Sequence, residues 1–210
     1  MQIHKYTKKE EVIHAITHGI GALLSIGALI LLTASTWAGN MTQLISAFIF
    51  GTTMFVMYLC STIVHSLPNG RWKEIFVIAD HSSIYLFIAG TYTPFLVLQL
   101  RGELGWKMLA IVWGIALVGI IFKIFFIDRF LVLSTFCYLL MGWLILFVWK
   151  PLLSTMHENG ILLLIIGGLF YSIGTVFYLW RGFCYHHVIW HIFVLAGSMF
   201  HFLCIFYYVV

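Results

Sequence analysis

GALLSIGALILL at residues 21–32 and ILLLIIGGL at residues 161–169 are continuous runs of apolar and small residues. Membrane barrel strands alternate apolar and polar residues over about ten positions, and neither run alternates in this way. A segment inside lipid must satisfy its own backbone hydrogen bonds, which leaves helices and closed barrels as the spanning structures. The two runs therefore predict membrane-spanning α-helices.

The composition supports the same class of protein. Hydrophobic residues make up 62% of the 210-residue chain and charged residues only 9%, against about 25% charged residues in typical globular proteins. So few charges could not cover the surface of a water-soluble fold. The formal net charge of +4 comes from basic residues scattered over loops, so we expect no nucleic-acid partner. The four cysteines lie in or beside apolar runs and read as small buried hydrophobes.

Seven segments are close to the roughly twenty residues needed to cross the hydrocarbon core. Turn residues separate them, and no connector has the length or composition of a domain linker. We therefore predict an all-α integral membrane protein, a seven-transmembrane helix bundle that forms one domain over residues 1–210. The predicted spans are Ile13–Ser35, Thr42–Ser66, Ile75–Leu98, Trp106–Phe126, Phe130–Trp149, Gly160–Trp180 and His187–Val209.

The distribution of Lys and Arg predicts the orientation, because cytoplasmic loops carry an excess of these residues. The N-terminal side of a seven-span bundle holds eight of the eleven: Lys5, Lys8, Lys9, Arg71, Lys73, Lys123, Arg129 and Arg181. The opposite side holds three: Arg101, Lys107 and Lys150. We therefore expect a cytoplasmic N-terminus and a C-terminus outside.

Several polar residues fall at membrane depth, where ionisable groups are costly and usually functional. This topology brings most of them to the inner end of the bundle, although they are far apart in the sequence. Two pairs, Ser61 with His65 and His187 with His191, have the four-residue spacing that places side chains on one helix face. The full set is His18, Ser61, His65, Asp80, His81, His187, His191 and His201.

Two imidazoles from one helix and one from another form the three-histidine set of catalytic zinc sites, in which water takes the fourth position. We predict this set to be His65, His187 and His191, with Asp80 free to act on the water as a base or an orienting acceptor. The alternative is that the histidines only bond neighbouring helices. His186 is expected at the interface. His201 lies roughly 15 Å from His191 at 1.5 Å per residue, too far to share a metal, and is expected to line the cavity.

These motifs resemble the hemolysin III group, the bacterial branch of the progestin and adiponectin receptor family. The resemblance rests on S-T-I-V-H at Ser61–His65, A-D-H-S-S around Asp80, H-V-I-W-H at His187–His191 and E-x-x-x-x-x-x-H-G at Glu11–Gly19. It implies a seven-helix bundle in which His65, His187 and His191 hold zinc, Asp80 contacts the metal's water and Ser61 assists. His14 departs from the pattern, which commonly has Asn there.

The resemblance also suggests function, because the wider superfamily includes alkaline ceramidases, which hydrolyse a lipid amide. The first hypothesis is a zinc-dependent lipid amidase, or a membrane-homeostasis factor derived from one, acting on a membrane lipid in the cell membrane. In it Asp80 is the general base and Ser61 hydrogen-bonds the developing oxyanion. The second is a non-enzymatic sensor of membrane state with structural zinc. A pore-forming protein is the third, although no span carries a continuous polar stripe, and a G-protein-coupled receptor is weaker because the predicted N-terminus is inside. No protein partner is evident.

Overall fold

The computed structural model describes residues 6–127 and 129–210, so Lys5 and Asp128 lie outside the described residues. Within the described part the chain is helical and contains no strand. It includes seven helical segments long and apolar enough to cross a membrane, which confirms the predicted all-α membrane class and the seven spans. The helices are α1 Lys8–Thr36, α2 Met41–Ser66, α3 Arg71–Pro94 with the π-helical turn η1 Phe95–Gln99, α4 Gly102–Phe126, α5 Leu131–Gly142 with the 3₁₀ segment η2 Trp143–Val148 and α6 Trp149–Thr155, α7 Glu158–Leu179 and α8 His186–Tyr208.

The predicted and observed span ends differ most at two places, the start of the first span and the end of the fifth. Helix α1 begins at Lys8, before the predicted Ile13, because Thr7 and Glu10 form a reciprocal capping box that extends the helix into polar sequence. The fifth span continues to Thr155, beyond the predicted Trp149. Pro151 does not stop it, because a new helix begins at Trp149 and a proline in a first turn gives up no hydrogen bond.

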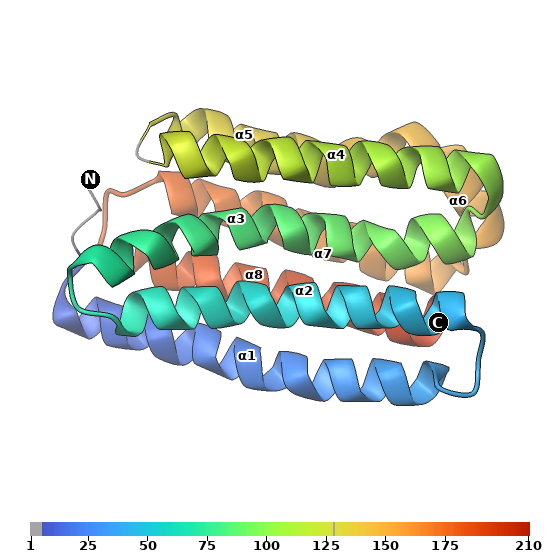
Figure 1. Cartoon of the computed structure of the whole chain (residues 1–210), viewed down its shortest axis with the longest axis horizontal. Coiled ribbons are helices and arrows are strands. Elements are labelled where there is room, and N and C mark those ends of the chain that lie inside the picture. Colours follow the sequence, from blue (N-terminus) through green and yellow to red (C-terminus); the bar gives the residue numbers. More distant parts are fainter. Residues whose placement is uncertain (1–5, 128) are drawn as a thin grey trace.

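The spans run up and down with short connections, so consecutive helices are antiparallel (Figure 1). Helix α1 packs on α2 and α8, α2 packs on α3, and α7 packs on α8. Helix α3 touches α2, α4 and α5, and its span is the most buried of the seven. The start of α1 and the α2–α3, α4–α5 and α7–α8 connections all lie at the left-hand end of Figure 1. We call this end the histidine end, because His65 and His187 lie there.

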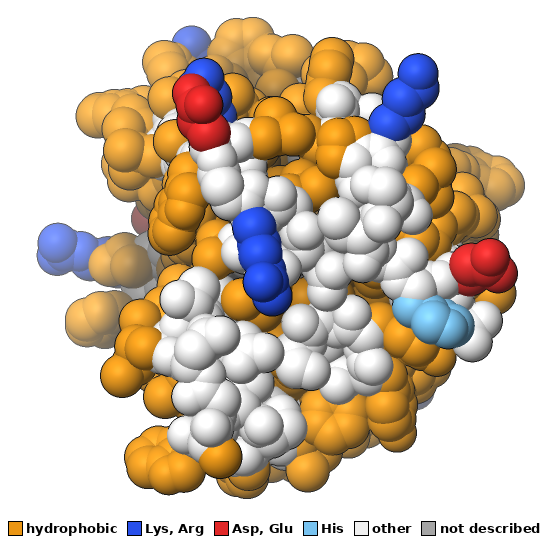
Figure 2. All heavy atoms as spheres, turned by 90° about the vertical axis from the view of Figure 1, so that its right-hand side faces the viewer, with side chains coloured by type: hydrophobic (Ala, Val, Ile, Leu, Met, Phe, Trp, Pro, Cys, Tyr) orange, Lys and Arg blue, Asp and Glu red, His pale blue; other side chains and the backbone are white. Residues whose placement is uncertain are grey.

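The outer surface of the bundle suits lipid. Large apolar side chains point outward along the spans, including Leu23 at 70% exposed and Phe147 at 82% exposed. The end opposite the histidines has apolar side chains around its rim and few, separate charged ones (Figure 2). Apolar surface of this extent needs an apolar solvent, so the structure is that of a multi-pass membrane protein.

A tyrosine from α3 forms hydrogen bonds with the backbone where the helix of the fifth span is interrupted. Where α5 gives way to η2, the Tyr92 hydroxyl lies 2.7 Å from the Gly142 carbonyl and 3.0 Å from the Met141 carbonyl. It also accepts the Ile145 N–H at 2.8 Å. Backbone groups freed at membrane depth must find a partner within the protein. Tyr92 therefore makes the interruption tolerable and joins α3 to the fifth span.

A close contact among α1, α2 and α8 supports the histidine end. Gly21 of α1 faces the Tyr58 ring of α2, and a Cβ at residue 21 would come within 2.5 Å of that ring. The ring is held in place, because the Tyr58 hydroxyl donates to Ser198 Oγ of α8 at 2.7 Å. Small residues let membrane helices approach closely, and Gly21 lets α1 reach both partners.

A cavity of about 320 Å³ extends from the histidine end into the bundle. Spans three, five, six and seven supply most of its walls. Near its polar mouth are His65, Asp80 and His187, and deeper walls are mainly apolar and aromatic, including Phe95 and Trp149. The cavity therefore joins a polar mouth to an apolar interior.

Candidate metal centre

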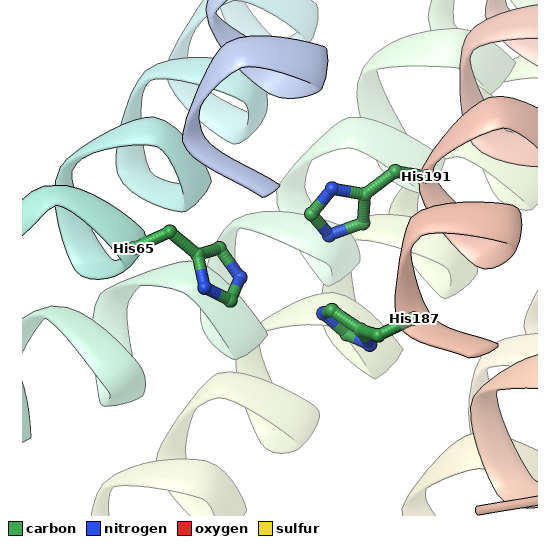
Figure 3. A group of neighbouring side chains, drawn as sticks. All are labelled: His65, His187 and His191. Carbon is green, nitrogen blue, oxygen red and sulfur yellow. The ribbon is translucent and has the colours of Figure 1, made fainter. Parts of the chain in front are cut away.

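Three histidines from two helices meet at the histidine end. His65 comes from α2, and His187 and His191 come from α8 (Figure 3). Each offers one ring nitrogen, and these nitrogens lie within 4.8 Å of one another. The ring centres are 4.5 Å apart for His187–His191 and 5.4 Å apart for each of the other two pairs. The three residues named from sequence are thus brought together, in a geometry that could hold a metal ion.

Local structure explains why these three residues converge. His65 lies one residue before the end of α2, and His187 is the second residue of α8, so both are close to the same end of the bundle. His191 follows one turn later on the same face of α8. The chain enters α8 through Tyr185, which has a left-handed backbone with φ of 62°. The Tyr185 N–H donates to Glu10 at 3.1 Å, which ties the start of α8 to α1.

A carboxylate orients the His65 ring. His65 Nδ1 lies 2.6 Å from Glu11 Oε2, and Lys73 Nζ lies 2.6 Å from Glu11 Oε1. Because a carboxylate accepts, His65 Nδ1 carries the proton, which leaves the Nε2 lone pair free. A carboxylate behind a ligating histidine is a common arrangement that fixes the tautomer and raises ligand basicity.

A hydroxyl orients the His191 ring in the same way. Thr17 Oγ1 donates its only proton to the His14 carbonyl at 2.9 Å and lies 3.0 Å from His191 Nδ1. With its proton on the His14 carbonyl, the hydroxyl accepts from His191 Nδ1–H. This leaves the Nε2 lone pair of His191 available, as it does for His65. His187 Nδ1 is buried and has no hydrogen-bond partner among the described residues.

Asp80 and Ser61 line the same cavity as the three histidines. The Ser61 side chain lies beside the Asp80 carboxylate, and Asp80 Oδ2 lies 4.0 Å from His81 Nδ1. Neither of the two potential metal-ligand groups found among the described residues includes Asp80. Asp80 therefore shares the cavity with the three histidines without belonging to either ligand group.

The other histidines have different surroundings. His81 Nε2 lies 3.1 Å from the Tyr178 hydroxyl. His201 lines the cavity, as expected, and its Nε2 lies 3.2 Å from the Leu164 carbonyl. His186 was expected at the interface but is only 3% exposed, because the α7–α8 connection folds back and brings its Nδ1 to 3.0 Å from the Phe177 carbonyl.

Sequence reasoning missed two residues of α1. Glu11 and His14 form a second potential ligand group with His65, with one atom from each within 4.8 Å of the others. His14 is 0% exposed, and His18, one turn later, stacks on His191 at 3.5 Å. The sequence did contain a pattern that could have identified them, because Glu11, His14 and His18 have the three- and four-residue spacing of one helix face.

The aromatic residue ahead of α1 closes over the cluster. Tyr6 stacks on His187, with ring centres 5.3 Å apart and 28° between the planes. Burial raises the pKa of the Tyr6 phenol above its usual value, so the phenol is neutral at physiological pH. A neutral cover adds no charge to oppose or attract a cation at the histidines.

Comparison with known proteins identifies the relatives of this chain. The sequence pattern of the family described as "Haemolysin-III related" matches residues 6–202. The chain belongs to this haemolysin-III-related family. It is 50% identical over 202 residues to "Hemolysin-3" of Bacillus cereus, covering 96% of this chain and 92% of the relative. It is 51% identical over 206 residues to "Hemolysin-3 homolog" of Bacillus subtilis (strain 168), covering 98% and 97%.

The haemolysin-III-related protein also has a more distant animal relative. It is 29% identical over 220 residues to "Monocyte to macrophage differentiation factor" of Homo sapiens, covering 98% of this chain and 87% of the relative. This similarity confirms the relation to the progestin and adiponectin receptor family. No solved structure matches the chain.

Proposed function

We propose that this haemolysin III protein is a zinc-dependent hydrolase of lipid amides, with His65, His187 and His191 as metal ligands. The observation that carries the proposal is the convergence of the three rings with their Nδ1 or Nε2 lone pairs available. The buried Nδ1 of His187 has no partner among the described residues, which is costly unless something binds it. Neutral imidazole is also a preferred ligand of zinc.

When bound, zinc would lower the pKa of a water molecule and polarise the substrate carbonyl. The work of the protein is positioning and proton transfer. Asp80 accepts a proton from the attacking water at its carboxylate and passes it to the amide nitrogen that leaves. Ser61 lines the same cavity beside Asp80, and its hydroxyl would turn from the carboxylate to donate to the carbonyl oxygen as negative charge develops there.

The cavity supports a lipid substrate. Its volume of about 320 Å³ lies within the range of small-molecule sites, at roughly 300–1,000 Å³. The polar mouth beside His65 and Asp80 suits an amide group, and the deeper walls formed by residues such as Phe95, Ile145 and Trp149 suit an acyl chain. Burial of the substrate's acyl chain in the cavity would hold its amide group beside the histidine cluster.

The Asp80→Asn variant tests the proposed role of Asp80. Asn keeps the size of the side chain and removes the basic carboxylate, so hydrolysis of a long-chain acyl amide by purified protein should fall about 10²–10⁴-fold. Zinc content should stay at the wild-type level, because Asp80 belongs to neither ligand group. Glu74→Gln, an exposed carboxylate on the same helix, is the matched control. Equal turnover by wild type and Asp80→Asn would remove Asp80 from the mechanism.

We further propose that the histidine end faces the cytoplasm. Among the described residues the basic side chains cluster at this end: Lys8, Lys9, Arg71, Lys73, Lys123, Arg129 and Arg181. The opposite end has Arg101, Lys107 and Lys150. Lys and Arg excess marks the cytoplasmic side.

Reporter fusions test this orientation. A reporter that folds only in the cytoplasm should be active at the N-terminus and inactive after Val210, and a reporter active only outside should show the reverse pattern. The opposite result would place the histidine cluster on the outer side, although it would leave its chemistry intact.

A further inference from the structure

His14 lies among the three proposed ligands. Its ring centre is 4.7 Å from that of His65, 4.9 Å from that of His187 and 5.3 Å from that of His191. The three ligand rings are 4.5, 5.4 and 5.4 Å from one another. All six distances among the four rings therefore fall in one narrow range.

Four imidazoles around one zinc ion predict such a range. With zinc–nitrogen bonds of about 2.0–2.1 Å in tetrahedral geometry, ring centres lie roughly 5 Å apart. The four rings thus already have nearly the spacing of a tetrahedral four-histidine centre. They come from three helices, α1, α2 and α8, which are the helices that pack together at this end.

Apart from the three proposed ligands, the His14 ring contacts Tyr6 edge-on, with ring centres 4.7 Å apart. It is 0% exposed, and neither ring nitrogen has a hydrogen-bond partner among the described residues. A buried polar group without a hydrogen-bond partner destabilises the folded protein. The ligand atoms of the three-histidine group do not include a His14 nitrogen, so the ring must turn about χ2 to direct a nitrogen toward the centre of the cluster. A metal bond would compensate for the burial.

A separate metal at Glu11, His14 and His65 fits the structure less well. Both carboxylate oxygens of Glu11 are engaged, one by His65 Nδ1 and one by Lys73 Nζ, at 2.6 Å each. A cation there would have to displace both contacts. Glu11 is better placed to orient His65 from behind and to offset the charge of a single ion.

We infer that His14 is the fourth ligand of the metal centre and closes the coordination position that a water would otherwise occupy. This inference rests on the proposed three-histidine centre and deepens it. Structural zinc sites are closed by four protein ligands, whereas catalytic sites keep one position open. In this chain the position opens only when the His14 ring turns away, so access of water and substrate to the metal is governed by α1.

Cobalt(II) in place of zinc tests the inference on the wild-type protein itself. Purified protein is loaded with cobalt and titrated with azide, which binds only at an open or water-filled position. The visible spectrum of wild-type protein should be that of a tetrahedral site and should not respond to azide. The spectrum of His14→Asn should respond, because Asn is too short to reach the metal. X-ray absorption of zinc-loaded wild type should show four imidazole nitrogens.

The control is His201→Asn, which changes a buried histidine of α8 that lies away from the cluster, with its Nε2 3.2 Å from the Leu164 carbonyl. Its cobalt spectrum should remain insensitive to azide. Zinc affinity should fall more than about 100-fold in His14→Asn, because loss of a direct ligand should exceed the 10–100-fold effect of losing an outer-shell partner.

A wild-type cobalt spectrum that changes with azide would overturn the fourth-ligand role and leave the three-histidine centre standing. If the wild type binds neither cobalt nor zinc, the fourth-ligand role of His14 and the three-histidine metal centre are both overturned. The wild-type spectrum decides the question even if His14→Asn does not fold.

Discussion

Purified wild-type protein is expected to hold about one zinc ion per chain, and His191→Ala is expected to bind zinc about 1,000-fold more weakly. His191 is 1% exposed, and Thr17 fixes its ring so that Nε2 faces the cluster. Its removal takes away a ligand that was already oriented. Loss of a direct ligand should exceed the 10–100-fold effect of an outer-shell partner. Metal analysis after competition with a chelator measures the difference.

Two further variants test whether the loss of zinc affinity depends on the distance of the changed residue from the metal. Glu11→Gln keeps all the histidines but weakens the hold on His65 Nδ1, so its zinc affinity should fall about 10–100-fold. His201→Ala removes a buried histidine from the same helix as His191 but away from the cluster, so its zinc affinity should match wild type. If gently purified wild type contains no zinc and takes up none, the histidines are helix contacts and the hydrolase proposal fails.

Gly21→Leu is expected to destabilise the bundle by about 3 kcal/mol or more. A Cβ at residue 21 would meet the Tyr58 ring at 2.5 Å and the Leu195 side chain at 2.9 Å. The Tyr58 ring cannot move aside without losing its bond to Ser198, so α1 itself must move away from α2 and α8. The loss of stability is measured by heating the protein in detergent and determining the fraction that remains folded at each temperature.

Gly27→Leu is the matched control on the same helix. No atom lies within 4 Å of a Cβ at residue 27, and Gly27 faces outward. The same substitution there should leave stability near wild type. Similar melting temperatures for the two variants would show that the contact of α1 with its neighbours is looser than the structure has it.

The class of fold could be predicted from sequence because it depends on the hydropathy of each segment, which can be read from that segment alone. Each span contains an apolar stretch of 18 residues, so its identity needs no knowledge of its neighbours. Helix ends were less predictable. The start of α1 depends on the Thr7–Glu10 capping box, and the end of the fifth span depends on a restart at Trp149 that lets Pro151 stand in a first turn.

The candidate site was predictable where helix periodicity and topology act together. His65, His187 and His191 were named because spacing puts two on one face and topology puts all three at one end. Glu11 and His14 were missed because the first span was expected to begin at Ile13. Glu11 then lay outside it, and His14 appeared only as a departure from a family pattern. The side-chain contacts that orient the rings, such as Thr17 with His191, arise from tertiary packing that no local pattern specifies.

The shallow position of the histidines has an electrical consequence. Moving one elementary charge through a full membrane potential of 100 mV involves about 2.3 kcal/mol, or roughly twice that for a divalent ion. His65 and His187 lie within the last or first turn of their helices, so a cation arriving from the histidine end crosses only a small part of that field. Occupancy of the cluster should therefore follow the ion concentration on that side and be nearly independent of membrane voltage.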